Sequence, residues 1–530
     1  MFSPEFGLQI RQKAKFLMEC QARTGVNFDV ALGIATYHAV CAEMKELEEK
    51  LTPHLPDVTT TKGNLIKVPK RRFRTGKNGL EKSADILKFE EDQGVAYTIE
   101  ELQALPEPHY LNPTSAFDLW SNTHQLELKQ LLMAKFGWRP YFWNYKKGKD
   151  GKPVYDDKKQ KIKISPKFQD QGKFCPNLEA LGDSVAFVQD IVLWTQKKHR
   201  RGVLKKKDGT GGWLGNPRLD IDGRISARSS GLTNTLRQKH TEICNVPKPD
   251  VHYGDKLRAM CRVPEGKVAV GYDAGSLEAV IKAHYAYKYD KGEYARKIED
   301  PAYDDHIDVA LSSGLITPEM AKLFTDHKLG KIPDEVAKAN PLWKPMKAGR
   351  TEAKPVNYGA QYGQQIAGLA EATGWSIEKA TLVWETYWEL NHGWKKCQQN
   401  LVRHWEQMDR RGIYCPISGL FLHSRSKNSL GSLLIQHTGA FIMDYAGVIL
   451  DKWLGGIKTD RDRPYYKFKG YECARVIYYH DEYMWESDPE IAEELLEMGK
   501  ESIREAARRL KLRVPLDADG AIGLNWADVH

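Results

Sequence analysis

Two short segments of this chain place carboxylates where they could act on phosphates. A hydrophobic run ends at Asp273, and two runs rich in Val, Ile, Tyr and Trp meet at His480-Asp481-Glu482. Such runs favour β-strands, so the sequence predicts Asp273 at a strand end and Asp481 at a hairpin turn. Two carboxylates on adjacent strands can hold a pair of divalent ions about 3.5–4 Å apart and thereby support phosphoryl transfer. Taken alone, an Asp-Glu pair is more often an ordinary turn.

A third segment has four residues spaced four apart, namely Arg350, Lys354, Tyr358 and Tyr362. On a helix they share one face, about 6 Å per step, so two cations are followed by two aromatic rings. Cations suit a triphosphate and rings suit a base or a sugar, which is the order that an incoming nucleotide needs. For this stripe alone, a solvated amphipathic helix with buried tyrosines is an equal alternative.

In this order, the three segments resemble motifs A, B and C of family A DNA polymerases, the Pol I family, and in particular the replicative enzymes of short-tailed bacteriophages. Motif A is an Asp followed five residues later by Glu, as at Asp273 and Glu278. Motif B corresponds to Arg350–Gly363, and motif C to His480-Asp481-Glu482. The resemblance extends over roughly residues 10–530.

The resemblance implies a DNA-directed DNA polymerase that adds dNTPs to a primer 3′-hydroxyl on a DNA template, in phage genome replication. It implies that Asp273, Asp481 and the carbonyl of Ala274 hold two Mg²⁺ ions, for which Mn²⁺ could substitute. Lys354 would stabilise the triphosphate and protonate the leaving group. Glu278 would fill the space of a ribose 2′-hydroxyl, so the resemblance implies deoxynucleotides.

Two sets of binding residues follow from the same resemblance. The nucleotide-binding residues are Arg350, Lys354, Tyr358, Tyr362, His306 and Glu278. The DNA-binding residues are Arg228, Gln436, His480, Lys197 and Lys198. The last two come from a basic stretch that we expect at a thumb tip riding on duplex phosphates, with a solvated lysine-rich loop as the alternative.

The elements that must position these residues are those of an α+β, right-hand polymerase fold. We expect a helical thumb at residues 1–225, an antiparallel-sheet palm at 226–300 and 416–530, and helical fingers at 301–415. Pro355 lies within motif B and predicts a bent or late-starting fingers helix, because proline removes a helical hydrogen bond. The length of 530 residues and the net charge of +9 agree with several subdomains and a polyanionic partner.

A basic, weakly periodic segment at about residues 52–110 reads as an insertion in the thumb. It would contact DNA or a processivity factor, with a flexible charged loop as an equal alternative. Thumb-like helices begin almost at Met1, so we expect no 3′–5′ exonuclease domain in cis; a separate exonuclease would then supply proofreading, or the enzyme would dispense with it.

The remaining composition excludes some classes of protein. The eight cysteines show no zinc-ligand spacing, no apolar run reaches membrane-spanning length, and no signal peptide is present. These features predict that the protein lies in the cytoplasm. If a phage encodes it, this is the cytoplasm of the host cell. A single-subunit RNA polymerase, a repair or lesion-bypass polymerase and a catalytically silent primer-template binding protein stay open as alternatives.

Overall fold

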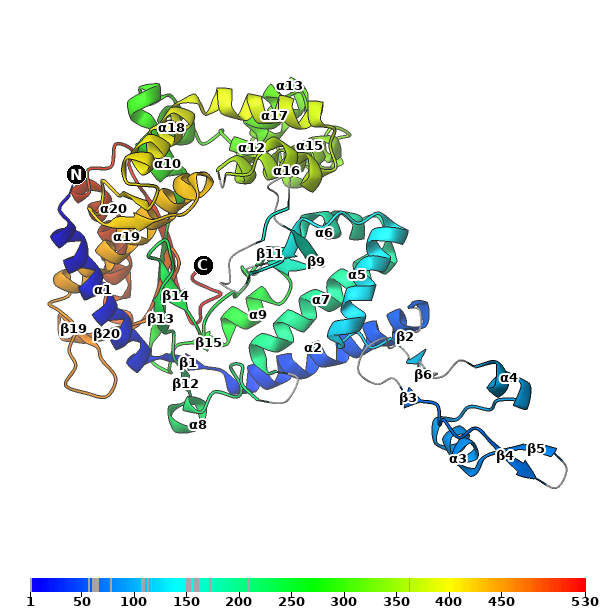
Figure 1. Cartoon of the computed structure of the whole chain (residues 1–530). Coiled ribbons are helices and arrows are strands. Elements are labelled where there is room, and N and C mark those ends of the chain that lie inside the picture. Colours follow the sequence, from blue (N-terminus) through cyan, green and yellow to red (C-terminus); the bar gives the residue numbers. More distant parts are fainter. Residues whose placement is uncertain are drawn as a thin grey trace. The chain divides into compact units, whose positions relative to one another are not determined.

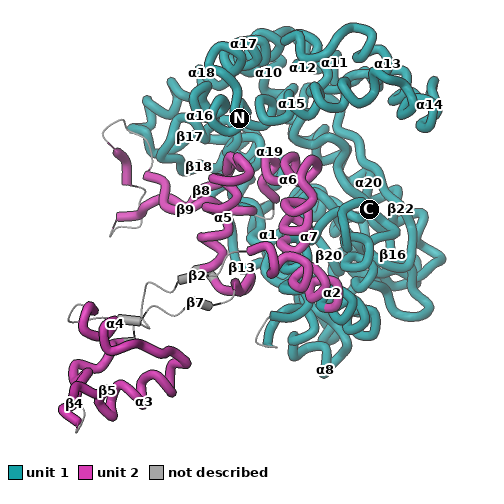
Figure 2. The backbone as a smooth tube through the Cα atoms, turned by 90° about the vertical axis from the view of Figure 1, so that its right-hand side faces the viewer, with its two compact units in different colours: residues 1–41, 169–173, 196–530 teal, residues 42–168, 174–195 magenta. Residues whose placement is uncertain are grey.

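The structure is a computed structural model. It describes the whole chain except residues 1, 56–57, 60–65, 77–78, 106–109, 112–113, 116, 149–153, 157–161, 171–172, 207–209 and 362. The chain forms two compact units, shown in Figure 2. Unit 1 comprises Met1–Cys41, Gln169–Lys173 and Gln196–His530, and unit 2 comprises Ala42–Phe168 and Phe174–Thr195.

A five-stranded antiparallel sheet lies at the centre of unit 1, in the order β19-β20-β21-β16-β22. Its strands are β16 (Val268–Ala274), β19 (Tyr466–Phe468), β20 (Tyr471–Tyr479), β21 (Glu482–Ser487) and β22 (Ala518–Gly523). The inner strand β16 therefore comes from the middle of the chain, while its neighbours β21 and β22 come from the C-terminal part. Figure 1 shows this as strands of different colours lying side by side.

The alternation of side chains in β16 decides which residues the sheet buries. Val270, Tyr272 and Ala274 belong to the large core under α19 (Leu430–Trp453) and α20 (Ala492–Arg509). Gly499 of α20 lies so close to the ring of Tyr272 that an added Cβ would come within 2.3 Å of it. Asp273 points to the opposite face, so it escapes this core.

The first helix, α1 (Pro4–Thr24), packs against α19 and β20. Arg11 on α1 forms a buried ion pair with Asp444 on α19. Residues 1–41 thus belong to the unit that contains the sheet. The compact units divide the chain differently from the predicted thumb at 1–225, and the domain assignment itself stays a prediction.

Helices dominate the part of unit 1 between β16 and β19. They are α10 (Leu277–Asp290), α11 (Glu293–Glu299), α12 (Asp305–Ser312), α13 (Pro318–Lys328), α14 (Asp334–Ala339), α15 (Trp343–Gln361), α16 (Ile366–Thr373), α17 (Ile377–Leu390) and α18 (His392–Gln407). The hairpin β17 (Gly412–Tyr414) and β18 (Phe421–His423) and the short helix η2 (Lys427–Ser429) then lead into α19.

The helix α15 runs through Pro355 without interruption. Of the two predicted alternatives, the late-starting helix is therefore wrong, and a bend at Pro355 stays a prediction. Burial explains why the helix tolerates the lost hydrogen bond, since Ala353, Val356 and Ala360 on its inner face are fully enclosed in the core.

Smaller elements complete unit 1. They are β1 (Val26–Phe28), α8 (Arg218–Asp222), β12 (Arg224–Ile225), β13 (Ser229–Leu232), β14 (Gln238–His240), α9 (Gly254–Ala259) and β15 (Cys261–Arg262). Their second core includes Ala269 and Met484, on the face of the large sheet that also carries Asp273.

Unit 2 contains most of the predicted thumb. Its helices include α5 (Asn122–Phe136) and α6 (Pro176–Gly182), while each of α2 (Val30–Leu51) and α7 (Ala186–Leu204) contributes residues to both units. The indoles of Trp120 and Trp194 both donate hydrogen bonds to Glu48 Oε1, at 2.7 and 2.9 Å. This shared acceptor ties the helices of unit 2 together.

The basic segment at about residues 52–110, for which a flexible charged loop was one of two alternatives, contains a small folded module. Its elements are β4 (Phe73–Gly76), β5 (Gly79–Lys82), α3 (Ala84–Gln93) and α4 (Ile99–Ala104), around a core of Val68, Ile86, Phe89 and Leu102. Arg72 is buried and donates to the carbonyls of Leu102 and Leu105. Arg72, a residue of the basic segment predicted to contact DNA or a processivity factor, therefore stabilises the module itself.

One helical stretch, Lys427–Trp453, is long and apolar enough to cross a membrane, in contrast to the expectation from sequence. In the most apolar 18-residue window of this stretch, 83% is buried inside the protein. The helix α19, which makes up most of the stretch, is the central core helix of unit 1. Burial against α1, α10 and α20 accounts for this composition.

Candidate active site

The turn between β20 and β21 carries the His-Asp-Glu segment. Tyr479 pairs with Glu482, so His480 and Asp481 alone make the turn, as the sequence predicts. His480 has φ of 61°, the left-handed conformation that tight hairpins require at their first central residue. Asp481 is exposed at this tip.

The two predicted carboxylates lie at the same edge of the sheet. Asp273 of β16 pairs directly with Glu482 of β21. The amide of Ala274 donates a hydrogen bond of 3.2 Å to the carbonyl of Asp481, which fixes the end of β16 against the hairpin turn. The structure therefore brings Asp273 and Asp481 together across strands about 200 residues apart in sequence.

These two carboxylates repel one another. Burial, followed by the charge of Asp481, raises the pKa of Asp273. Crowding by neighbouring protein atoms, followed by the charge of Glu482, raises the pKa of Asp481. In the described chain, neither carboxylate forms an ion pair with a lysine or arginine. A divalent cation would relieve this repulsion, so the residues fit the expected ions.

Glu482 is different because protein groups already neutralise its charge. Its side chain is buried and accepts hydrogen bonds from Arg258, at 3.2 Å, and from His530. Burial would raise the pKa of Glu482, but these partners lower it overall. The described residues contain no group of three or more His, Cys, Asp and Glu side chains arranged for a metal. Asp273 and Asp481 remain the candidate side-chain ligands.

Asp519 is an acidic neighbour that the sequence analysis missed. It lies on β22 directly opposite Asp273, on the side away from Glu482, and it is exposed. Only the pairing of β22 with β16 reveals it, and no local pattern in residues 518–523 indicates that pairing.

Arg350, the first residue of the predicted cationic stripe, is engaged within the protein. Its Nη2 donates to Asp304 Oδ2 at 2.6 Å and its Nε to Oδ1 at 3.2 Å. Asp304 also accepts from the amides of His306 and Ile307, and so caps α12. Burial opposes ionisation, yet the Arg350 hydrogen bond lowers the pKa of Asp304 overall. Asp304 was missed, although an Asp before a helix is a recognisable capping signal.

His306 is oriented by the helix that carries the stripe. The Nδ2 amide of Asn357 lies 2.8 Å from His306 Nδ1, so a neutral ring that accepts there carries its proton on Nε2. Burial lowers the pKa of His306. Its ring also lies 5.5 Å from that of Tyr358. The structure thus joins two predicted nucleotide-binding residues.

Lys354 and Tyr358 follow on the same face of α15. Lys354 is half-buried and, within the described residues, has no ion-pair partner. Burial, followed by the charge of Arg350, lowers its pKa. Tyr358 is 52% exposed. Tyr362, the last residue of the stripe, lies outside the described residues.

Two other predicted residues lie on helices that leave or cover the sheet. Glu278 is exposed in the first turn of α10, five residues after Asp273. Gln436 is half-exposed on α19, between the buried Ile435 and His437.

Arg228 and His480 keep positions that a DNA strand could reach. The Arg228 side chain is 56% exposed and forms an ion pair of 2.7 Å with Glu242. His480 lies beside His240, with ring centroids 5.4 Å apart. The contact between His240 and His480 joins the β13–β14 region to the hairpin site, whereas the Arg228–Glu242 ion pair lies within that region.

The prediction for Lys197 needs correction. Lys197 is buried at 6% exposure, and its Nζ lies 2.8 Å from His252 Nε2. Lys197 and the half-buried Lys198 lie within α7 rather than beside a turn. The phase of this helix turns Lys197 inward, so it is not available to ride on duplex phosphates.

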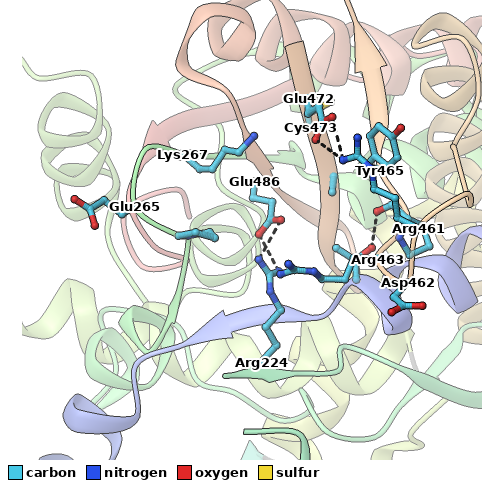
Figure 3. Close-up of a pocket in the computed structure, with 14 residues that line it drawn as sticks. Arg224, Glu265, Lys267, Arg461, Asp462, Arg463, Tyr465, Glu472, Cys473 and Glu486 are labelled. Carbon is cyan, nitrogen blue, oxygen red and sulfur yellow. Dashed lines mark hydrogen bonds and ion pairs between the residues drawn. The ribbon is translucent and has the colours of Figure 1, made fainter. Parts of the chain in front are cut away.

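A polar pocket of about 540 Å³ lies at the end of β21 away from the hairpin turn (Figure 3). There Arg224 pairs with Glu486 at 2.9 Å and Arg461 pairs with Glu472 at 3.1 Å. The charges of these residues are balanced within the pocket, which separates it from the unpaired carboxylates of the candidate site.

Comparison with known sequences gives consistent results. A family model described as DNA polymerase family A matches residues 334–528. The DNA-directed DNA polymerase of Escherichia phage T7 is 25% identical over 571 residues, which cover 99% of this chain and 70% of the phage protein. That of Escherichia phage Phieco32 is 26% identical over 283 residues, 51% of this chain and 41% of the phage protein.

A solved structure has the same fold. It is described as the POL domain of Pol1 from M. smegmatis in complex with DNA primer-template and dNTP, and it matches with a TM-score of 0.60 at 16% identity. The match covers 98% of this chain and 70% of that chain. The α+β polymerase fold expected from sequence is thereby confirmed.

Proposed function

Because the model of DNA polymerase family A matches residues 334–528, we propose that this chain is a member of that family and extends a DNA primer with dNTPs on a DNA template. The observation that carries this proposal is the pair Asp273 and Asp481, two crowded carboxylates without a protein counter-ion in the described chain. The polymerases of phages T7 and T3, each matched over 99% of this chain, support DNA synthesis as the activity.

Asp273, Asp481 and the Ala274 carbonyl would hold two Mg²⁺ ions. When bound, such ions lower the pKa of a primer hydroxyl and stabilise the departing pyrophosphate. Glu482 is already paired with Arg258 and His530, so it would not bind a metal ion. It would instead keep the hairpin turn in place. The Ala274–Asp481 hydrogen bond keeps the two carboxylates in register.

The face of α15 would bind the dNTP. The Lys354 ammonium, without a described carboxylate partner, would neutralise the triphosphate, and its lowered pKa favours proton donation to the leaving group. His306 would donate from Nε2 to a phosphate oxygen, since Asn357 occupies its Nδ1. Exposed Glu278 would exclude a 2′-hydroxyl, so dNTPs are the proposed substrates.

Primer extension with Mg²⁺ tests the proposal. Wild type should extend a labelled primer with dNTPs and much less with rNTPs, whereas Asp481→Asn should lose extension because the amide neutralises one of the two carboxylates. Asp462→Asn, an exposed carboxylate in another loop, is the matched control and should extend normally. Equal extension by wild type and Asp481→Asn would contradict the proposed site.

We further propose that the module around residues 66–105 contacts DNA or a processivity factor. Lys70, Arg71 and Arg74 are exposed there, although Arg74 pairs with Glu81 at 3.0 Å. Replacing Lys70 and Arg71 with Gln should shorten the products of a single binding event while leaving the first insertion unchanged. Unchanged product length, with and without candidate factors, would contradict this contact.

A further inference from the structure

A lysine is buried in the helical part of unit 1 that also carries His306. Lys282 lies on α10, one turn after Glu278, and is only 4% exposed. Its ammonium forms no ion pair with a described carboxylate. Burying a charge without a paired counter-ion is costly, and an apolar side chain of similar size would avoid this cost. Packing alone therefore does not account for a lysine at this position.

Two tyrosine rings lie against the ammonium of Lys282. Its Nζ is 4.0 Å from the ring centroid of Tyr294 on α11 and 5.6 Å from that of Tyr387 on α17. Both rings are buried. A cation over the face of a tyrosine ring is attracted to it and polarises the ring and its hydroxyl. The hydroxyl of Tyr294 therefore becomes a stronger hydrogen-bond donor.

The Tyr294 hydroxyl carries this effect to Asp305, the first residue of α12. It donates to Asp305 Oδ2 at 2.9 Å, and the hydroxyl of Tyr303 donates to Oδ1 at 2.8 Å. Burial lowers the pKa of Lys282 overall, and the charge of Asp305 is the largest effect that opposes this change. The ammonium and the carboxylate thus stabilise each other through Tyr294 without forming an ion pair.

Asp305 is also held from the side of α15. Its backbone carbonyl accepts a hydrogen bond of 3.2 Å from Asn357 Nδ2, and the same amide lies 2.8 Å from His306 Nδ1. A rotation of Asp305 would move this carbonyl, and with it the amide that orients His306. The preceding residue, Asp304, is held separately by Arg350. Two successive carboxylates therefore fix the start of α12, one toward α15 and the next toward α11.

We propose that Lys282 is a positioning residue for nucleotide binding. Through Tyr294 and Asp305, it sets the direction in which the next residue, His306, presents Nε2 to a phosphate oxygen. The inference rests on the proposed function, in which His306 contacts the dNTP. Lys282 is enclosed by protein and does not touch the substrate, so its contribution is to dNTP affinity. It should appear in KM rather than in kcat.

Lys282→Met tests this role, because methionine fills a similar space without a charge. The variant should raise the KM for dNTP about fivefold, the effect of weakening one hydrogen bond in the site, and leave kcat nearly unchanged. Steady-state single-nucleotide insertion measures both constants. Lys288→Met is the matched control, because Lys288 lies on the same helix, 5.8 Å from the ring centroid of Tyr289, but is exposed. It should keep the wild-type KM.

Tyr294→Phe is a second test that keeps the ring and its packing. It removes only the hydroxyl that donates to Asp305, so it should raise KM to a similar extent. Tyr289→Phe removes a hydroxyl that accepts from the Asn400 amide at 2.9 Å; it is the control and should keep the wild-type KM. If Lys282→Met does not fold, Tyr294→Phe decides the question alone.

A double variant separates positioning from a general loss of structure. Lys282→Met combined with His306→Ala should have the same KM as His306→Ala alone, because the effect of Lys282 passes through His306. A further rise of KM in the double variant would overturn the proposal. The wild-type KM in both Lys282→Met and Tyr294→Phe would also overturn it, as would an equal rise in Lys288→Met.

The tautomer of His306 separates this inference from the proposed function. Its Nδ1 accepts from Asn357, so Nε2 carries the proton of the neutral ring. Nitrogen NMR of the histidine-labelled protein, without DNA or nucleotide and with His306→Ala to assign the signal, should show less of this tautomer in Lys282→Met and Tyr294→Phe.

The NMR experiment and primer extension can fail independently. If wild type extends no primer but the His306 signal changes in both variants, the proposed function is contradicted and the link from Lys282 to His306 is supported. If wild type extends the primer and the signal is the same in all variants, the positioning role alone is contradicted.

Discussion

The guanidinium of Arg350 holds the carboxylate of Asp304 by two hydrogen bonds, at 2.6 and 3.2 Å. This pair connects α15 to the N-terminus of α12, where His306 lies. The side chain expected to contact phosphates therefore also positions a second phosphate-binding candidate. Arg350 acts on the structure of the site as well as on its charge.

Arg350→Lys should raise the KM for dNTP about tenfold, because lysine keeps the charge but cannot make the paired hydrogen bonds. Asp304→Asn should have a similar effect through the loss of the same pair. Steady-state single-nucleotide insertion measures both. Arg296→Lys, an exposed arginine on α11, is the control, and an equal rise of KM in this variant would contradict the specific role of the pair.

Asp273→Asn should reduce kcat at least about 100-fold, as expected when one of two charged groups that support phosphoryl transfer is neutralised. Asp519→Asn changes the carboxylate on the other side of the same strand position and should reduce kcat only a few-fold. Rapid-quench insertion measures both rates. A similar loss of kcat in the two variants would show that Asp273 and Asp519 contribute equally to the reaction.

Arg258→Met should lower the free energy of unfolding by about 3–5 kcal/mol, because it leaves Glu482 charged in a buried position. The double variant with Glu482→Gln should regain part of this loss. Arg262→Met removes a half-exposed ion pair with Asp29 and should cost less than about 1 kcal/mol. Urea unfolding monitored by circular dichroism compares the three, and equal losses would contradict the buried-charge argument.

Acid should destabilise the protein through His437. This side chain is fully buried on α19, bonded to Ser418 and Thr235, and burial lowers its pKa from 6.5 to about 3. Between these values the unfolded chain binds a proton that the folded chain does not, so stability falls as pH falls from about 6.5 toward 3. The slope reaches about 1.4 kcal/mol per pH unit.

His437→Gln should flatten this dependence, whereas His392→Gln, on the surface of α18, should preserve it. Urea midpoints at several pH values measure the slope. An unchanged slope in His437→Gln would assign the acid sensitivity to other groups.

The hairpin site could be predicted because its signals are local. Alternating β-prone residues before and after His480 and Asp481 favour two strands, and a strand end at Asp273 follows from the same reasoning. The α+β class and the helical course of residues 350–361 also follow from local patterns. These are the features that the structure reproduces.

Other features depend on packing that the local sequence does not encode. Pro355 predicts a bent or late-starting helix, but α15 begins well before it, and burial of its inner face offsets the lost hydrogen bond. Lys197 belongs to a basic run, yet it lies three residues after the buried Trp194 and so faces inward. The contacts of Asp304 and Asp519 join segments that are distant in the chain.

The register of β16 against β21 and β22 also determines how the protein can fold. Strand β16 is complete at Ala274, but both of its partners are made from residues after 481. Pairing must therefore close a loop that contains the whole helical excursion from α10 to α19, and such non-local pairing slows folding. We expect the helices of that excursion to form before the sheet, so that assembly of the two carboxylates is a late event in folding.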